Sequence, residues 1–223
     1  MLKKWIENIK KQRDHYKCDS WKYHISGNSL ELSVLPAHSK NIENYRCAVI
    51  NIGQVIQALA YQIEKSGLQF HIQSFPSLEN PSLVATVRID KKGNTRFYNT
   101  ENIYTIVPDL VKTEEICTMM KKIAERFQLR LVESKPEWVT DLTPADISEE
   151  PKQFTLFSEY DNPFTWLKIG YWKEMIYGDC KNHLDENRKF LISDFCVKLD
   201  RKNFVYKSQK REYIQAILFL YDN

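Results

Sequence analysis

The chain has 223 residues, 43% of them hydrophobic and 27% charged, which is typical of a folded protein with a sizeable core and argues against intrinsic disorder. Its formal net charge of +3 is too small for a protein that binds nucleic acid mainly by electrostatic attraction. We therefore expect a single globular domain over residues 1–223 that does not bind nucleic acid, although the length would also fit two small domains.

The cysteines and the apolar segments predict where the protein resides. The five cysteines are scattered and include no Cys-x-x-Cys pair, which argues against a disulfide framework and against a structural zinc site. The first residues mix charged and apolar side chains, unlike a signal peptide. The longest uncharged run, residues 47–63, has 17 residues and four amide side chains, and is short for a bilayer span. The sequence therefore predicts a cytoplasmic protein without membrane contact.

Charge is distributed unevenly along the chain. Residues 1–22 carry seven basic and three acidic side chains, and residues 198–212 carry six basic and two acidic ones. Residues 133–161 carry two basic and eight acidic side chains. If the two basic segments meet in the fold, they could face an anion such as a phosphate. Otherwise they are ordinary solvated surfaces.

The N-terminal part of the chain predicts a helix followed by a hairpin. Residues 3–16 place apolar side chains on one side and lysines on the other, as an amphipathic helix does. Residues 21–25 and 30–34 alternate apolar and polar side chains on either side of Gly27-Asn28. This pattern predicts two strands joined by a tight turn.

Residues 45–66 predict a helix that is apolar nearly all round. No charged residue occurs between Arg46 and Glu64, and Gly67 stands where a helix commonly ends. One helical face is traced at spacings of three and four by Val49, Ile52, Ile56, Leu59 and Ile63. A helix of this kind packs on more than one side, so we expect it at the centre of a domain or in a dimer interface.

The rest of the chain predicts further strands and helices, and no internal repeat is detected. Strands are predicted at 69–75, 83–89, 129–133, 154–158 and 213–221, and helices at 113–127 and 163–177. Residues 139–152 predict an acidic surface connection with a short helix. Gly170 lies within a helix, which indicates close approach to a neighbouring backbone or ring. The apolar C-terminal strand must insert into a sheet, either its own or a partner's.

No local motif nominates a catalytic group or a metal site. The chain has no G-x-G-x-x-G or Walker loop, no G-x-S-x-G elbow and no H-E-x-x-H. The five histidines lie apart, and none has a companion at metal-ligating spacing. An enzyme with this sequence would take its reactivity from a bound cofactor.

Two N-terminal segments resemble the nitroreductase superfamily. Residues 17–35 resemble the Asn-x-Gln-Pro-Trp segment that leads into a hairpin, with Trp21 at the Trp. Residues 46–67 are similar to the central helix of that family, with Gly53 and Gly67 at its glycine positions. The resemblance continues in the same order along the chain.

The later segments resemble the divergent Acg-type branch of this superfamily. Residues 74–89 fit the Pro-rich link and strand that follow the central helix. Residues 213–221 resemble the terminal Pro-Gln-x-x-x-Arg strand, with Gln215 at the Gln. The Asp-x-Pro-x-x-Trp-Leu-x-x-Gly helix is matched by Asp161, Pro163, Trp166, Leu167 and Gly170.

The resemblance implies a nitroreductase-like α+β fold, in which a central, mostly antiparallel sheet is flanked by helices. It also implies a buried central helix and FMN held at the interface of a homodimer whose C-terminal strands are exchanged. Where the family has Asn, Gln and Pro before its Trp, this chain has Lys17, Asp19 and Ser20. The arginine-rich segment of the Acg-type branch has only residues 99–102, without arginines, as its counterpart, and the terminal Arg is Phe219.

These matches and departures define a candidate flavin site. The ring would lie near Trp21, Lys17 would stabilise the reduced ring near its N1–C2 edge, and basic side chains would bind the phosphate. The candidate set is Arg13, Lys17, Asp19, Ser20, Trp21, Lys207, Lys210 and Arg211.

The resemblance implies an FMN-dependent oxidoreductase. Electrons would pass from NAD(P)H through the flavin to a flat, electron-poor acceptor, such as a small aromatic or quinone-like molecule. Two alternatives stay open because of the altered positions. One is a protein that stores or sequesters FMN without turnover, and the other is a homologue that has lost the flavin and serves as an interaction module.

Overall fold

The computed structural model describes residues 1–12, 20–90, 113–133, 152–183, 188–194 and 212–222. The chain divides into two compact units. The first unit comprises Met1–Thr105 and Trp166–Glu174, and the second comprises Ile106–Thr165 and Met175–Asn223. Both are α+β and antiparallel, which confirms the general fold class. A single central sheet was expected, whereas each unit has a four-stranded sheet of its own.

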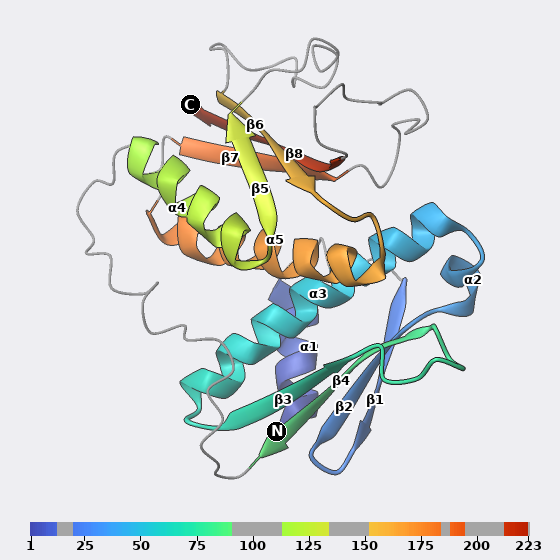
Figure 1. Ribbon diagram of the computed structural model, residues 1–223. Coiled ribbons are helices and arrows are strands. Elements are labelled where there is room, and N and C mark those ends of the chain that lie inside the picture. Colours follow the sequence, from blue (N-terminus) through green and yellow to red (C-terminus); the bar gives the residue numbers. More distant parts are fainter. Residues whose placement is uncertain (13–19, 91–112, 134–151, 184–187, 195–211, 223) are drawn as a thin grey trace. The chain divides into compact units, whose positions relative to one another are not determined.

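The first unit packs helices on one four-stranded sheet of order β1-β2-β4-β3 (Figure 1). Its elements are α1 (Leu2–Gln12), β1 (Trp21–Ser26), β2 (Ser29–Val34), α2 (Pro36–Ser39), α3 (Ile42–Lys65), β3 (Gln69–Ser74) and β4 (Leu83–Asp90). All neighbouring strands are antiparallel. Helix α3 contacts β2, β3 and β4, and α1 contacts α3, so the core of this unit lies between the sheet and these helices.

The predicted hairpin and the predicted central helix are both confirmed in the first unit. Gly27 has a φ of +59° in the turn, and the Asn28 side chain donates a hydrogen bond of 2.6 Å to the Ile89 carbonyl. Helix α3 begins three residues before the predicted start because the Asn41 side chain accepts hydrogen bonds from the Glu43 and Asn44 amides. It ends before Gly67, whose φ is +69°.

The second unit has its own sheet, of order β5-β6-β8-β7. Its elements are α4 (Thr113–Arg126), β5 (Leu129–Glu133), β6 (Lys152–Ser158), β7 (Arg188–Asp194), β8 (Tyr213–Asp222) and the two ends of α5 (Pro163–His183). Strand β7 was missed by the sequence analysis. The predicted C-terminal strand is confirmed as β8, which lies between β6 and β7 of its own chain. The strand exchange expected from the resemblance is therefore not needed to complete this sheet.

The two units repeat one topology, although no internal repeat was detected in the sequence. Each runs helix, strand, strand, helix, strand, strand, and α2 is the one additional helix among the described residues. In each sheet, the first and third strands of the unit stand at the two edges. Helices α3 and α5 occupy the same position in this order, and both contain an Ile-Gly pair, at Gly53 and Gly170.

The two glycines allow a close helix approach within the first unit. A Cβ atom added to Gly170 would lie 2.1 Å from the Ile50 carbonyl oxygen and 2.8 Å from the Gly53 Cα. A Cβ added to Gly53 would lie 2.3 Å from the Leu167 carbonyl oxygen. Both distances are far below van der Waals contact, so only glycine fits at either position. The close approach predicted for Gly170 is confirmed.

Helix α1 is attached to β1 by polar contacts. The Tyr23 hydroxyl donates a hydrogen bond to the Glu7 carboxylate, and the Lys10 Nζ lies 5.2 Å from the centroid of the Tyr23 ring. The hydrogen bond from Tyr23 lowers the pKa of Glu7 below its ordinary value of 4.5. Because the folded-state pKa is lowered, this contact stabilises the fold above pH 4.5, and the stabilisation is lost as the pH falls through the lowered pKa.

We expect Tyr23→Phe to raise the pKa of Glu7 toward 4.5 because the substitution removes the largest cause of the shift. The lysines near Glu7 would keep part of the lowering. An NMR titration of the Glu7 carboxyl carbon measures the change, with Tyr61→Phe on α3 as a control that leaves the Glu7 pKa as it is. An unchanged Glu7 pKa in Tyr23→Phe would contradict the assigned hydrogen bond.

Candidate functional site

Two of the eight candidate flavin residues lie in the described part of the chain, and both are buried in the first unit. Ser20 is 3% exposed and Trp21 is 5% exposed. The other candidates lie outside the described residues: Arg13, Lys17, Asp19, Lys207, Lys210 and Arg211. The structure therefore does not place the candidate set together, and the predicted flavin contacts stay a prediction.

Ser20 and Trp21 have structural roles at the start of β1. The Ser20 carbonyl accepts a hydrogen bond of 2.9 Å from the Leu35 amide, which extends the pairing of β1 with β2. The Lys10 Nζ lies 4.9 Å from the centroid of the Trp21 ring, a cation–π contact with α1. These contacts and its burial make Trp21 part of the attachment of α1 to the sheet.

A buried polar network fixes the backbone where β6 leads into α5 in the second unit. Gln215, which is 0% exposed, donates hydrogen bonds of 2.8 Å to the Ser158 Oγ and 3.3 Å to the Asp161 Oδ1. The Ser158 hydroxyl in turn donates a hydrogen bond of 2.7 Å to the Tyr160 carbonyl. The network therefore joins β8 to the end of β6 and to residues 159–162, which connect β6 to α5 and are called the connection below.

The same connection ends in a helix cap. The Asn162 Oδ1 accepts a hydrogen bond of 3.0 Å from the Thr165 amide, and Pro163 is the first residue of α5. A side-chain cap followed by proline fixes the start of a helix, and α5 begins at residue 163 as predicted. The backbone from Ser158 to Thr165 is thus held at both ends by side-chain hydrogen bonds.

Three exposed aromatic side chains surround this fixed connection, and we call them the aromatic corner: Tyr160, Phe164 and Tyr213. Their exposed fractions are 60%, 56% and 50%. Tyr160 lies in the connection, Phe164 in the first turn of α5, and Tyr213 opposite Ser158 in the register of β8 with β6. Single exposed apolar side chains are common, but exposed aromatic side chains that group at one place are typical of a binding surface.

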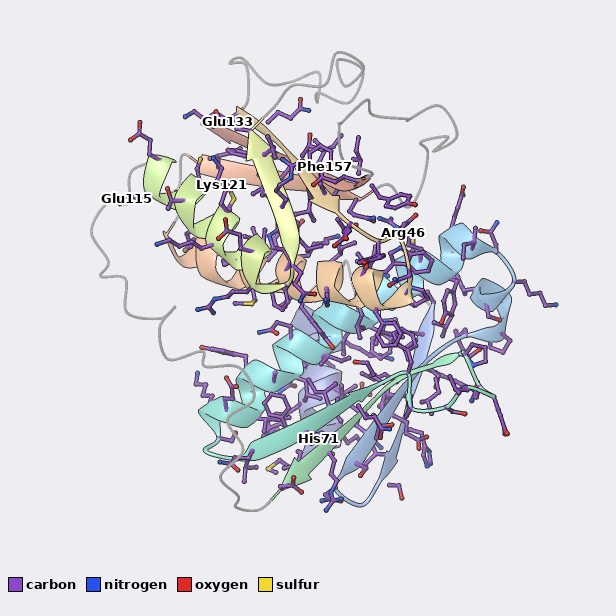
Figure 2. The ribbon with its side chains drawn as sticks, in the orientation of Figure 1. Arg46, His71, Glu115, Lys121, Glu133 and Phe157 are labelled. Carbon is purple, nitrogen blue, oxygen red and sulfur yellow. The ribbon has the colours of Figure 1, made fainter. Side chains whose placement is uncertain are left out.

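Acidic side chains accompany the aromatic corner. Glu159 is exposed and Asp161 is partly exposed, and both stand next to Tyr160 in the chain. Glu212, beside Tyr213, forms an ion pair with Arg130, whose Nε lies 2.9 Å from the Glu212 Oε1. Arg130 also lies over the Phe157 ring, at 4.8 Å from its centroid; Figure 2 labels Phe157 on β6. Arg130 is thus paired with Glu212, and among the described residues Glu159 and Asp161 place carboxylates directly beside Tyr160 in the chain.

Two residues outside the aromatic corner have pKa values that burial raises. Burial raises the pKa of Tyr45, whose hydroxyl donates a hydrogen bond of 2.7 Å to the Pro81 carbonyl in the first unit. Burial also raises the pKa of the Cys117 thiol on α4 of the second unit.

In the described ranges, no three His, Cys, Asp or Glu side chains form a metal-binding group. Within these ranges, no helix is long and apolar enough to cross a membrane.

Comparison of the sequence with models of protein families and with curated proteins gives no match. The corner combines aromatic rings with carboxylates on a fixed backbone, and both kinds of group attract cations. The sequence analysis missed the aromatic corner. The signal lies in the YDNPF sequence, where Tyr160 and Phe164 flank a helix cap.

Proposed function

We propose that the chain is an interaction module whose aromatic corner binds a Lys- or Arg-bearing segment of another protein. The observation that carries this proposal is the exposure of Tyr160, Phe164 and Tyr213, each at least half exposed. Aromatic side chains release a large free energy when they leave water and lose little conformational entropy on binding. They are therefore common at the energetically dominant positions of protein interfaces.

The rigidity of the corner supports the proposal. The connection is held by the Ser158–Tyr160 and Asn162–Thr165 hydrogen bonds, so its backbone is ordered before a partner arrives. A surface that is already ordered loses less conformational entropy on association. The buried Gln215 amide supports this connection from beneath.

The chemistry of the corner favours a basic partner. Lysine and arginine are attracted to the faces of tyrosine and phenylalanine rings, and also to carboxylates. Glu159 and Asp161 supply carboxylates beside Tyr160. A segment with Lys or Arg side chains would make both kinds of contact.

Peptide selection tests this function. Peptides from a random library that bind the wild type, but not the triple variant Tyr160→Ser, Phe164→Ser, Tyr213→Ser, should be enriched in Lys and Arg. Each single replacement should weaken the binding of the selected peptides about tenfold or more, since tenfold corresponds to about 1.4 kcal/mol. Tyr61→Ser, at a residue that is 44% exposed on α3, is the matched control and should bind like the wild type. Selection of acidic peptides, or of none, would contradict the proposal.

The flavin oxidoreductase implied by the resemblance is the competing proposal. The α+β class with antiparallel sheets is compatible with it, whereas the division into two sheets differs from the single central sheet that the resemblance implies. The absorption spectrum of the freshly purified protein separates the possibilities. A flavin band that NAD(P)H bleaches would favour the nitroreductase-like enzyme, and bound FMN that only dithionite reduces would favour a sequestering protein. A colourless protein whose addition does not quench the fluorescence of FMN is the result expected for the interaction module.

A further inference from the structure

The four edge strands of the two sheets differ in how they are protected. Strands β1 and β3 are the edges of the first sheet, and β5 and β7 are those of the second. Proteins commonly place charged residues on edge strands because a charge there discourages pairing with another strand. Strand β1 contains Lys22, β5 contains Arg130 and Glu133, and β7 contains Arg188 and Lys189.

Strand β3 has none of these protective features. Its sequence, QFHIQS over Gln69–Ser74, contains no Lys, Arg, Asp or Glu and no proline. Its register with β4 is regular, without a bulge. Phe70 and Ile72 favour strand structure. A neutral, regular edge strand of this kind is suited to pairing with another strand.

The outward backbone groups of β3 follow from its pairing with β4. The Phe75 amide donates a hydrogen bond of 2.7 Å to the Val84 carbonyl, so Phe75 belongs to the residues whose backbone faces β4. Backbone direction alternates along an antiparallel pair. The amides and carbonyls of Phe70, Ile72 and Ser74 therefore face away from β4, toward the side on which no other described strand pairs with β3.

We propose that β3 pairs with β3 of a second copy of this chain, antiparallel and about a twofold axis at Ile72. This register joins the outward-facing residues: Ile72 lies opposite Ile72 of the second copy, and Phe70 lies opposite its Ser74. His71 then lies opposite Gln73 of the second copy. The two first sheets would continue into one another across the interface.

The second copy fits this edge because the strand is complementary to itself. A twofold interface brings each residue against a fixed residue of the identical strand. In β3, no pair places like charges together because the strand carries no charged residue, and Ile72 meets its own apolar side chain. The dimer expected from the resemblance is thereby assigned to an edge that the sequence analysis did not consider.

The test places positive charge on the solvent-exposed side chains of β3. His71 and Gln73 are both exposed, and Figure 2 labels His71 on this strand. In the proposed register, His71→Lys together with Gln73→Lys puts each introduced lysine opposite an introduced lysine of the second copy. Multi-angle light scattering should give twice the 26.5 kDa chain mass for the wild type, and the single chain mass for this variant.

The matched control is His24→Lys together with Ser26→Lys. These residues occupy two exposed positions with the same spacing on β1, the other edge of the same sheet. The control should keep the dimer mass. A monomeric wild type, or a β3 variant that stays dimeric, would overturn the proposal, as would a control that dissociates equally.

Hydrogen exchange of the wild type provides a second measurement that does not depend on a variant. In the dimer, the amides of Phe70, Ile72 and Ser74 should exchange slowly, and their exchange should become faster as dilution dissociates the dimer. Fast exchange at all concentrations would overturn the proposal. Slow exchange that appears only when another protein is added would also overturn it, because the occupant would then be a partner's strand.

Discussion

Gly170→Ala should destabilise the first unit by about 3 kcal/mol or more, because the added methyl group meets backbone atoms that cannot rotate away. The ideal Cβ position lies 2.1 Å from the Ile50 carbonyl oxygen and 2.9 Å from the Gln54 nitrogen. Relief requires the helix segments that contain Gly53 and Gly170 to move apart. Urea unfolding should show a lower midpoint, with the loss in the transition of the first unit if the two units unfold separately.

Gly178→Ala is the matched control, because it makes the same substitution farther along α5. A Cβ added at Gly178 meets no atom within 4 Å. Alanine is the better helix former, so this change should stabilise the helix by about 0.5–1 kcal/mol. Equal and small effects of the two substitutions would mean that the close approach at Gly170 does not exist.

The local elements of this fold could be predicted because their signals are local. The alternation of apolar and polar side chains on either side of Gly27-Asn28 predicts the first hairpin. The run of uncharged, mostly apolar residues after Arg46 predicts α3. Both depend on side-chain periodicity and on turn residues, and they need no knowledge of distant partners. The same reasoning found the start of α5 at Pro163 and the close approach at Gly170, since each follows from a residue in its immediate context.

The pairing of these elements could not be predicted in the same way. Strand order depends on contacts between distant segments, such as that of Gln153 with Phe219 in the register of β6 with β8. A buried C-terminal strand is compatible with its own sheet and with a partner's, and only the structure places β8 inside its own sheet. The repeat of the two units was also hidden, because topology is repeated while little beyond the Ile-Gly pairs of α3 and α5 is shared.

The candidate site shows where inference from single residues reaches its limit. Trp21 is a large aromatic residue at the start of a strand, and sequence cannot distinguish a ring that stacks on a ligand from one that packs inside the unit. The structure shows it to be 5% exposed beneath Lys10. Tyr160 and Tyr213 are separated by more than fifty residues, so the aromatic corner becomes visible only when β8 is paired with β6.

The second large effect is expected for Gln215→Leu, which should destabilise the second unit by about 2–3 kcal/mol. Gln215 is fully buried, and its amide donates to the Ser158 hydroxyl and to the Asp161 carboxylate. Leucine has a similar size but donates no hydrogen bond, so both acceptors lose a partner. Ser158 is buried, at 5% exposed, and a buried acceptor that loses its partner costs more than the net gain of the bond. Asp161 is partly exposed, so water can replace its lost hydrogen bond.

Gln153→Leu on the neighbouring strand β6 is the matched control for this second prediction. Gln153 is 8% exposed, and its Nε2 has no hydrogen-bond partner among the described residues, so its replacement removes a buried donor that these residues leave unsatisfied. The expected change in the free energy of unfolding is within about 1 kcal/mol of zero, or slightly stabilising. If both variants unfold at the same urea concentration as the wild type, the hydrogen bonds of Gln215 do not stabilise the second unit. The connection beneath the aromatic corner would then be fixed by the Asn162 cap alone, and the corner would lose one of its two supports.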